Sequence, residues 1–80
     1  VPQRTAALLL RMGEEQGRVT TEGTVIDLTL SREEMAESIG SARETVIRAL
    51  SKLGKAGVIR IEKRQITILD AERLRVWAQM

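Results

Sequence analysis

The segment from Ser31 to Leu53, SREEMAESIGSARETVIRALSKL, constrains the fold most strongly, because its spacing predicts two short helices joined by a tight glycine turn. Ser31 stands three residues before Glu34, the capping-box spacing, so the first helix is expected to begin at Arg32. Gly40 is expected to end this helix, because glycine readily adopts the positive φ found after a helix C-terminus. The apolar stripe of this helix consists of Met35, Ala36 and Ile39.

The second helix repeats the pattern, with Ser41 as the expected cap and Glu44 as its capping-box partner. It is expected to run to about Ala56, where Gly57 stops it. Apolar residues at helical spacing form one face, namely Val46, Ala49, Leu50 and Leu53. The opposite face carries Arg43, Glu44, Ile47, Arg48 and Ser51. One face is therefore expected to pack on a core, while the other is free to make contacts outside the domain.

The remaining segments predict two further helices and two hairpins. Helices are expected over Gln3 to Gln16 and over Ala71 to about Gln79, the second one capped by Asp70. β-branched runs predict that residues 18–20 pair with residues 25–28, and that residues 58–61 pair with residues 65–69 around a charged tip at 62–64. The sequence thus predicts one α+β domain over residues 1–80, mainly helical, a winged helix-turn-helix with small β-hairpins.

Composition excludes most chemistry. The chain has no cysteine and no histidine, so the sequence offers neither thiolate metal sites nor the commonest general base, and we expect no enzyme activity, metal or cofactor here. The only aromatic residue is Trp77, which argues against RNA recognition by base stacking. No apolar run long enough to cross a membrane and no signal peptide are present, so a cytoplasmic location is expected. Because the chain begins at Val1 rather than methionine, we expect it to be a piece of a longer protein.

Charge is distributed unevenly along the chain. Residues 43–64 contain seven basic and two acidic residues, a net charge of +5, whereas the remainder contains six basic and nine acidic residues, a net charge of −3. Such asymmetry is typical of a surface that meets phosphates. Candidate phosphate contacts in this region are Lys52, Lys55, Arg60, Lys63 and Arg64, although any single one is more often merely solvated.

The exposed face of the second helix has side chains suited to reading bases. An arginine can donate two parallel hydrogen bonds to guanine, so Arg43 and Arg48 are candidates for G·C pairs. Glu44 can accept from cytosine N4, and Ile47 can contact a thymine methyl group. In the alternative interpretation, Glu44 only caps the helix with Ser41 and forms a solvated i,i+4 ion pair with Arg48. A second alternative is a winged-helix module that binds protein through the apolar strip around Ile47; the lysine-rich surroundings argue against it.

The run LTLSREEMAESIGSARETVIRALSKLGKAGVIRIEKRQITILD, and above all the motif G-S-x-R-E-T-V-x-R from Gly40 to Arg48, resembles the C-terminal DNA-binding domain of the Crp/Fnr family, the cyclic AMP receptor protein and its relatives. The resemblance implies that Arg43, Glu44 and Arg48, with Ile47 beside them, read a G·C-containing half-site of the TGTGA type. The expected phosphate contacts are Ser31, Arg32, Ser41, Thr45, Lys52, Lys63 and Arg64.

The resemblance also implies partners beyond this chain. Family members act as homodimers on palindromic double-stranded DNA, and an N-terminal domain binds the effector, a cyclic nucleotide or another ligand. Many contact RNA polymerase through the loop that matches Val19 to Asp27. This chain departs from the family at Ala42, where relatives often carry a hydroxyl, and at the tip 62–64, which lacks the usual glycine. The effector, the target genes and the choice between activation and repression stay open.

Overall fold

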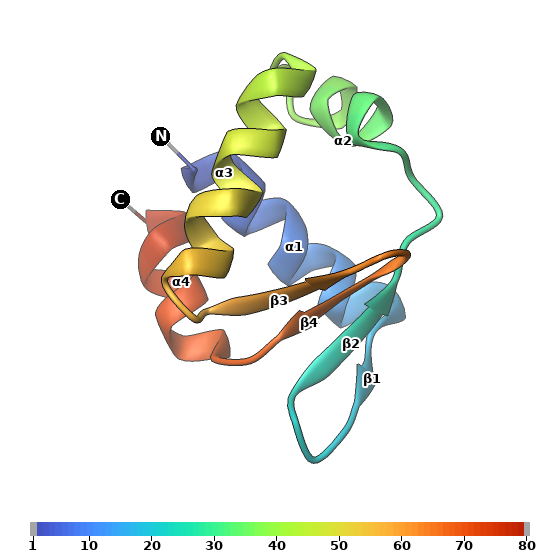
Figure 1. Ribbon diagram of the computed structural model, residues 1–80, viewed down its shortest axis with the longest axis vertical. Helices are drawn as coiled ribbons and strands as arrows, with labels where there is room; N and C mark the ends of the chain where they lie inside the picture. Colours follow the sequence, from blue (N-terminus) through green and yellow to red (C-terminus); the bar gives the residue numbers. More distant parts are fainter. Residues whose placement is uncertain (1, 80) are drawn as a thin grey trace.

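The computed structural model describes residues 2–79, in which helices and two hairpins alternate along the chain (Figure 1). In chain order the elements are α1 (Gln3–Gln16), β1 (Arg18–Val19), β2 (Thr24–Asp27), α2 (Arg32–Ser38), α3 (Arg43–Lys55), β3 (Ile59–Glu62), β4 (Gln65–Ile68) and α4 (Ala71–Gln79). The predicted winged helix-turn-helix is confirmed: α2 and α3 form the helix-turn-helix, and β3 with β4 forms the wing.

The two predicted hairpins belong to one antiparallel sheet with the strand order β1-β2-β4-β3. The sequence had not predicted that β2 pairs with β4, and this pairing joins the hairpins into a single layer. Its register places Ile26 opposite Ile66, which in turn lies opposite Ile61 on β3. Because alternate residues of a strand face opposite sides, this row shares one face of the sheet.

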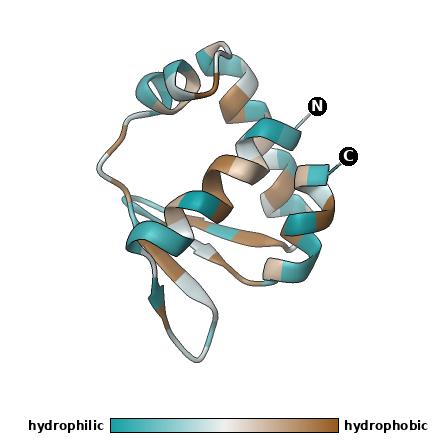
Figure 2. Ribbon diagram, turned by 180° about the vertical axis from the view of Figure 1, so that it is seen from behind, coloured by the Kyte–Doolittle hydropathy of each residue, from teal (hydrophilic) through white to brown (hydrophobic). Residues whose placement is uncertain are grey.

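The core lies between this apolar face of the sheet and the helices. Figure 2 shows how hydrophobic and hydrophilic residues alternate along the helices and strands that enclose it. On α3 the four residues predicted to pack are all buried, namely Val46, Ala49, Leu50 and Leu53. The largest fully buried side chains outside α3 include Leu9, Ile26, Met35, Ile66 and Leu74, which come from five different elements. Burial of the predicted stripe fixes which side of α3 remains exposed.

The first predicted helix start is confirmed in detail. The Ser31 hydroxyl accepts a hydrogen bond from the Glu34 amide at 3.1 Å, and the Glu34 carboxylate accepts one from the Ser31 amide at 3.0 Å. Asp70 likewise caps α4, since its carboxylate accepts from the Arg73 amide at 3.1 Å. Both caps satisfy amides that have no partner within the helix.

The predicted cap at Ser41 is wrong. Helix α3 begins one residue later than expected, with Ala42 at the cap position and no side-chain cap hydrogen bond. The Ser41 amide instead donates to the Ala36 carbonyl at 2.9 Å, and Gly40, with φ of 66°, donates to the Glu37 carbonyl at 3.3 Å. These two bonds form a Schellman motif, so Ser41 completes the end of α2 rather than the start of α3.

The wing turn is shorter than predicted. Glu62 pairs with Gln65 at the end of the ladder, so only Lys63 and Arg64 form the turn. Within residues 2–79 positive φ occurs only at glycines, so this turn requires none, which accounts for the absence of glycine at the tip. The Arg64 carbonyl accepts a hydrogen bond from the Leu28 amide at 2.8 Å, which holds the turn beside the segment that leads into α2.

Among the described helices, none is long and apolar enough to cross a membrane.

Candidate nucleic-acid interface

The exposed face of α3 carries the residues that the sequence singled out. Arg43, Glu44 and Arg48 are exposed, and Ile47 keeps 38% of its surface accessible. They project from a helix whose opposite face is buried in the core, so the positions of their backbone atoms are fixed by packing. A rigid helix with an exposed polar face is the element that winged helix-turn-helix domains insert into the major groove.

These side chains lack the partners that the alternative interpretation required. Among the residues that the structure describes, Arg48 donates only to the backbone carbonyl of Glu44 in its own helix, over 3.4 Å. Among residues 2–79 the structure shows no ion pair that involves Arg43, Glu44 or Arg48. Since Ser41 does not cap α3, neither half of the capping and ion-pair alternative describes Glu44. The charges of this face are therefore available to an external ligand.

The ion pairs of the described chain lie instead on the outer face of the sheet. Arg18 on β1 contacts the Asp27 carboxylate on β2 at 3.1 Å, and the Gln65 amide on β4 donates to the same carboxylate at 2.8 Å. The hydrogen bond from Gln65 and the charge of Arg18 hold the pKa of Asp27 below its ordinary value. Three strands are thus joined by one polar row.

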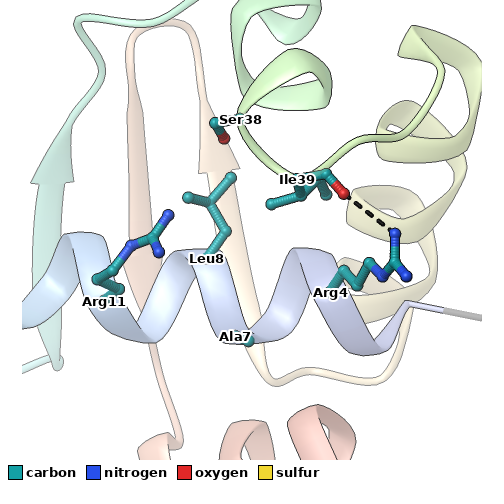
Figure 3. A pocket seen from close by; sticks show the side chains of 6 residues that line it. All are labelled: Arg4, Ala7, Leu8, Arg11, Ser38 and Ile39. Atoms are coloured by element: carbon teal, nitrogen blue, oxygen red, sulfur yellow. Dashed lines mark hydrogen bonds between the residues drawn. The ribbon is translucent and has the colours of Figure 1, made fainter.

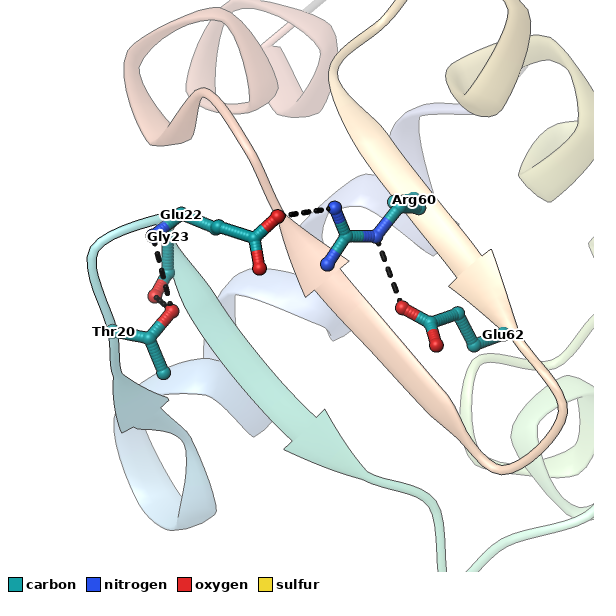
Figure 4. A network of polar contacts seen from close by, with 5 residues as sticks. All are labelled: Thr20, Glu22, Gly23, Arg60 and Glu62. Carbon is teal, nitrogen blue, oxygen red and sulfur yellow. Dashed lines mark hydrogen bonds and ion pairs between the residues drawn. The ribbon is translucent and has the colours of Figure 1, made fainter.

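A second group surrounds Arg60 on β3. Its guanidinium donates to Glu22, in the turn between β1 and β2, at 2.6 Å and to Glu62 at 3.0 Å (Figure 4). The hydrogen bond and charge of Arg60 lower the pKa of Glu22, while those of Glu22 and Glu62 raise the pKa of Arg60. Arg60 was one of the candidate phosphate contacts, but two carboxylates already neutralise it. The positive charge of the wing therefore comes from its turn.

The remaining phosphate candidates occupy separate places around α3. Lys63 and Arg64 are exposed at the wing turn, while Ser31 and Arg32 begin α2, three to four residues beyond Leu28, which bonds to the wing. Ser41, in the turn between α2 and α3, and Thr45, in the first turn of α3, are half-buried. Lys52 lies on α3 with its ammonium 5.9 Å from the ring centre of Trp77 on α4, a contact that the sequence did not predict.

A small hollow of about 230 Å³ lies between α1 and the end of α2 (Figure 3). Its lining residues are Arg4, Ala7, Leu8, Arg11, Ser38 and Ile39. Arg4 donates to the Ile39 carbonyl at 3.2 Å, which places a positive charge at the C-terminal end of α2. A cation there complements the helix dipole and satisfies a free carbonyl, so Arg4 supports the helix-turn-helix.

A helix-turn-helix followed by a charged wing, with an exposed arginine- and glutamate-bearing face on the second helix, defines the class of winged helix-turn-helix DNA-binding domains. The model of the Crp-like helix-turn-helix domain matches residues 3–77, nearly the whole chain. The chain therefore belongs to the Crp/Fnr family, as the motif from Gly40 to Arg48 had indicated.

Similar sequences are transcription regulators. The chain is 41% identical over 76 residues to the CRP-like cAMP-activated global transcriptional regulator of Mycobacterium tuberculosis, a match that covers 92% of this chain and 33% of that protein. It is 44% identical over 75 residues to the transcriptional activator protein FnrL of Cereibacter sphaeroides, covering 92% of this chain and 27% of that protein. The chain thus spans between about a quarter and a third of the length of these relatives.

Similar solved structures have the same fold. A CRP/FNR-family transcriptional regulator from Thermus thermophilus has a TM-score of 0.84 at 30% identity, covering 100% of this chain and 41% of that chain. The CO-dependent transcription factor CooA from Carboxydothermus hydrogenoformans has a TM-score of 0.86 at 27% identity, covering 96% of this chain and 36% of that chain. The chain is the DNA-binding domain of a Crp/Fnr-like transcription regulator, and these matches are to regulators rather than enzymes.

Proposed function

We propose that α3 reads a G·C-containing half-site of the TGTGA type in the major groove. Arg43 and Arg48 each donate to a guanine, Glu44 accepts from cytosine N4, and Ile47 contacts a thymine methyl group. The observation that carries this proposal is that both arginines and the glutamate are exposed on one rigid helix and, within residues 2–79, are free of ion-pair partners. An acidic side chain beside DNA is unfavourable unless it accepts a hydrogen bond from a base, so Glu44 supports base reading in particular.

Contacts to the DNA backbone set the register of the domain but do not read sequence. The proposed phosphate contacts are Ser31, Arg32, Ser41, Thr45, Lys52, Lys63 and Arg64. The wing turn and the start of α2 are held near each other by the hydrogen bond between Leu28 and Arg64, which supports their acting on the same stretch of backbone. Ser41 is free for this role because it does not cap α3.

The regulator that contains this domain is proposed to act on DNA in the cytoplasm, as a homodimer on a palindrome. Half-sites about one helical turn apart match the two-fold symmetry of such a dimer. An effector, a cyclic nucleotide or another small ligand, is proposed to bind outside these residues, as the name of the cAMP-activated relative suggests. Residues 19–27, which include the turn held by Arg60, are the proposed contact for RNA polymerase.

The test is the affinity of the domain for a duplex with two TGTGA-type half-sites and for a scrambled duplex, across a salt series. The palindrome is expected to bind more tightly, and Arg43→Ala and Glu44→Ala are expected to remove the difference while nearly preserving the salt dependence. Equal binding of both duplexes, or no binding, would contradict base reading and favour a protein-binding module instead.

A further inference from the structure

Lys52 on α3 and Trp77 on α4 form a contact between the two helices. The Lys52 ammonium lies 5.9 Å from the ring centre of Trp77, within the range of a cation–π interaction. Lys52 is exposed, whereas Trp77 is half-buried and packs against the hydrophobic core. The ring is therefore held by the body of the domain, while the lysine lies at its surface.

This contact lies on the side of α3 away from the wing. Gly54 marks the side near β3, since a Cβ at that position would lie 3.8 Å from the Ile61 side chain. Lys52 precedes Gly54 by two residues, which places it about 160° away around the helix axis. The wing turn, with Lys63 and Arg64, comes directly after β3 in the chain. A helix in the major groove has a phosphate backbone on each side, and these basic groups lie on opposite sides of α3.

Arg60 and Lys52 are held in two different ways, and only one of these ways neutralises the positive charge of the side chain. Arg60 is held by the carboxylates of Glu22 and Glu62, which cancel its charge. Lys52 is held by an aromatic ring, which attracts the ammonium but carries no net charge. Within residues 2–79 no ion pair involves Lys52, so its positive charge remains available.

We propose that Trp77 is a positioning residue, which holds Lys52 ready to contact a DNA phosphate on the α4 side of α3. This inference rests on the proposed DNA binding by α3 and adds a residue of α4 to it. A lysine stem has several rotatable bonds, and ordering it on binding costs conformational entropy. The ring restricts Lys52 before DNA arrives, so part of that cost is already met in the free protein.

The experiment compares the wild type with Lys52→Ala, Trp77→Leu, the double variant and Trp77→Phe, using the palindromic and scrambled duplexes over a salt series. Lys52→Ala is expected to weaken binding to both duplexes by a similar factor and to lower the salt slope by about 0.9, the value for one phosphate contact. Trp77→Leu is expected to weaken binding about two- to tenfold, the factor that corresponds to ordering one long side chain on binding.

Two comparisons separate positioning from a general structural role. Trp77→Leu should have no further effect once Lys52 is alanine, and Trp77→Phe, which keeps an aromatic ring, should restore most of the affinity. Lys55→Ala is the matched control, because Lys55 is a basic residue in the last turn of the same helix. When Lys55→Ala is combined with Trp77→Leu, the loss of affinity should equal the product of the two separate losses. Thermal melting and circular dichroism check that every variant is folded.

A spectroscopic measurement makes the test independent of whether Trp77→Leu folds. Trp77 is the only tryptophan, so the indole emission of the wild type should change when a phosphate approaches Lys52, and should not change in Lys52→Met. Three results would each overturn the positioning role of Trp77 but not the proposed DNA binding by α3. They are wild-type affinity in Trp77→Leu, independent effects of Lys52→Ala and Trp77→Leu, and an emission change of equal size in Lys52→Met. If the wild type bound neither duplex, both the DNA-binding proposal and the positioning role of Trp77 would be overturned.

Discussion

The guanidinium of Arg60 on β3 donates a hydrogen bond of 2.6 Å to the carboxylate of Glu22 in the turn between β1 and β2 (Figure 4). The two residues are 38 positions apart in the chain. Together with the pairing of β2 and β4, this contact joins the first hairpin to the wing. The turn proposed to contact RNA polymerase and the wing proposed to contact DNA are therefore parts of one connected sheet.

The carboxylates of this sheet face predict how stability depends on pH. The pKa values of Glu22 and Asp27 are lowered from ordinary values of 4.5 and 3.8 by their hydrogen bonds to Arg60 and Gln65. A carboxyl group with a lowered pKa contributes its stability above the unfolded-state pKa and loses it as the pH falls through the folded-state pKa. The melting temperature should therefore decrease as the pH falls below about 4.5.

Glu22→Gln combined with Asp27→Asn should reduce this acid-dependent loss, because neither amide titrates. The expected effect is small, since both side chains are exposed and water screens their charges. Glu15→Gln on α1 is the matched control, because Glu15 is exposed and makes no ion pair among the described residues. Melting curves between pH 2 and pH 7 test this, and an unchanged acid dependence in the double variant would contradict it.

The two serines at the predicted helix starts should differ in their effect on stability. Ser31→Ala removes an observed capping box and is expected to cost about 1 kcal/mol, which lowers the melting temperature by roughly 4–8 °C. Ser41→Ala should change stability by less than about 0.5 kcal/mol, because its hydroxyl does not cap α3. Thermal melts of both variants provide the comparison. Equal losses would mean that the start of α3 depends on Ser41 after all.

The same two serines show how far the sequence could predict the fold. Both are followed three residues later by glutamate, so local spacing alone cannot distinguish them. Gly40 decides between them, because its positive φ lets the Ser41 amide bond back to Ala36 and places Ala42 at the cap. Local patterns predicted the helices well, since caps and apolar periodicity act within a few residues.

The contacts that the sequence could not predict are those between distant segments. The strand pairing of β2 with β4 brings residues 24–27 beside residues 65–68, and no periodicity within either strand indicates it. For the candidate site, helical spacing predicted the exposed face with Arg43, Glu44 and Arg48. It could not predict that carboxylates neutralise Arg60 or that Trp77 contacts Lys52, because those partners come from other elements.

Two glycines should respond in opposite ways to replacement by alanine. Gly23 has φ of 145°, and a Cβ there would clash with the Ile68 carbonyl oxygen, so Gly23→Ala is expected to destabilise the protein strongly. Gly54 lies inside α3, and a Cβ there would meet only ordinary contact with Ile61 at 3.8 Å. Gly54→Ala should therefore stabilise the protein by about 0.5–1 kcal/mol. Urea unfolding measures both changes, and a loss of stability in Gly54→Ala would contradict the open space at that site.

The arginines of α3 and of the wing should affect DNA binding differently. Arg48→Ala is expected to reduce the preference for the palindrome over the scrambled duplex by about 1–3 kcal/mol, because a lost guanine contact lowers only specific binding. Arg64→Ala should weaken binding to both duplexes by a similar factor and lower the salt slope by about 0.9, as expected for a lost phosphate contact. Arg60→Ala is the matched control on the wing: its charge is already neutralised by Glu22 and Glu62, so the salt slope should hardly change. A slope that falls by about 0.9 in Arg60→Ala would show that Arg60 exchanges its carboxylate partners for a phosphate when DNA binds.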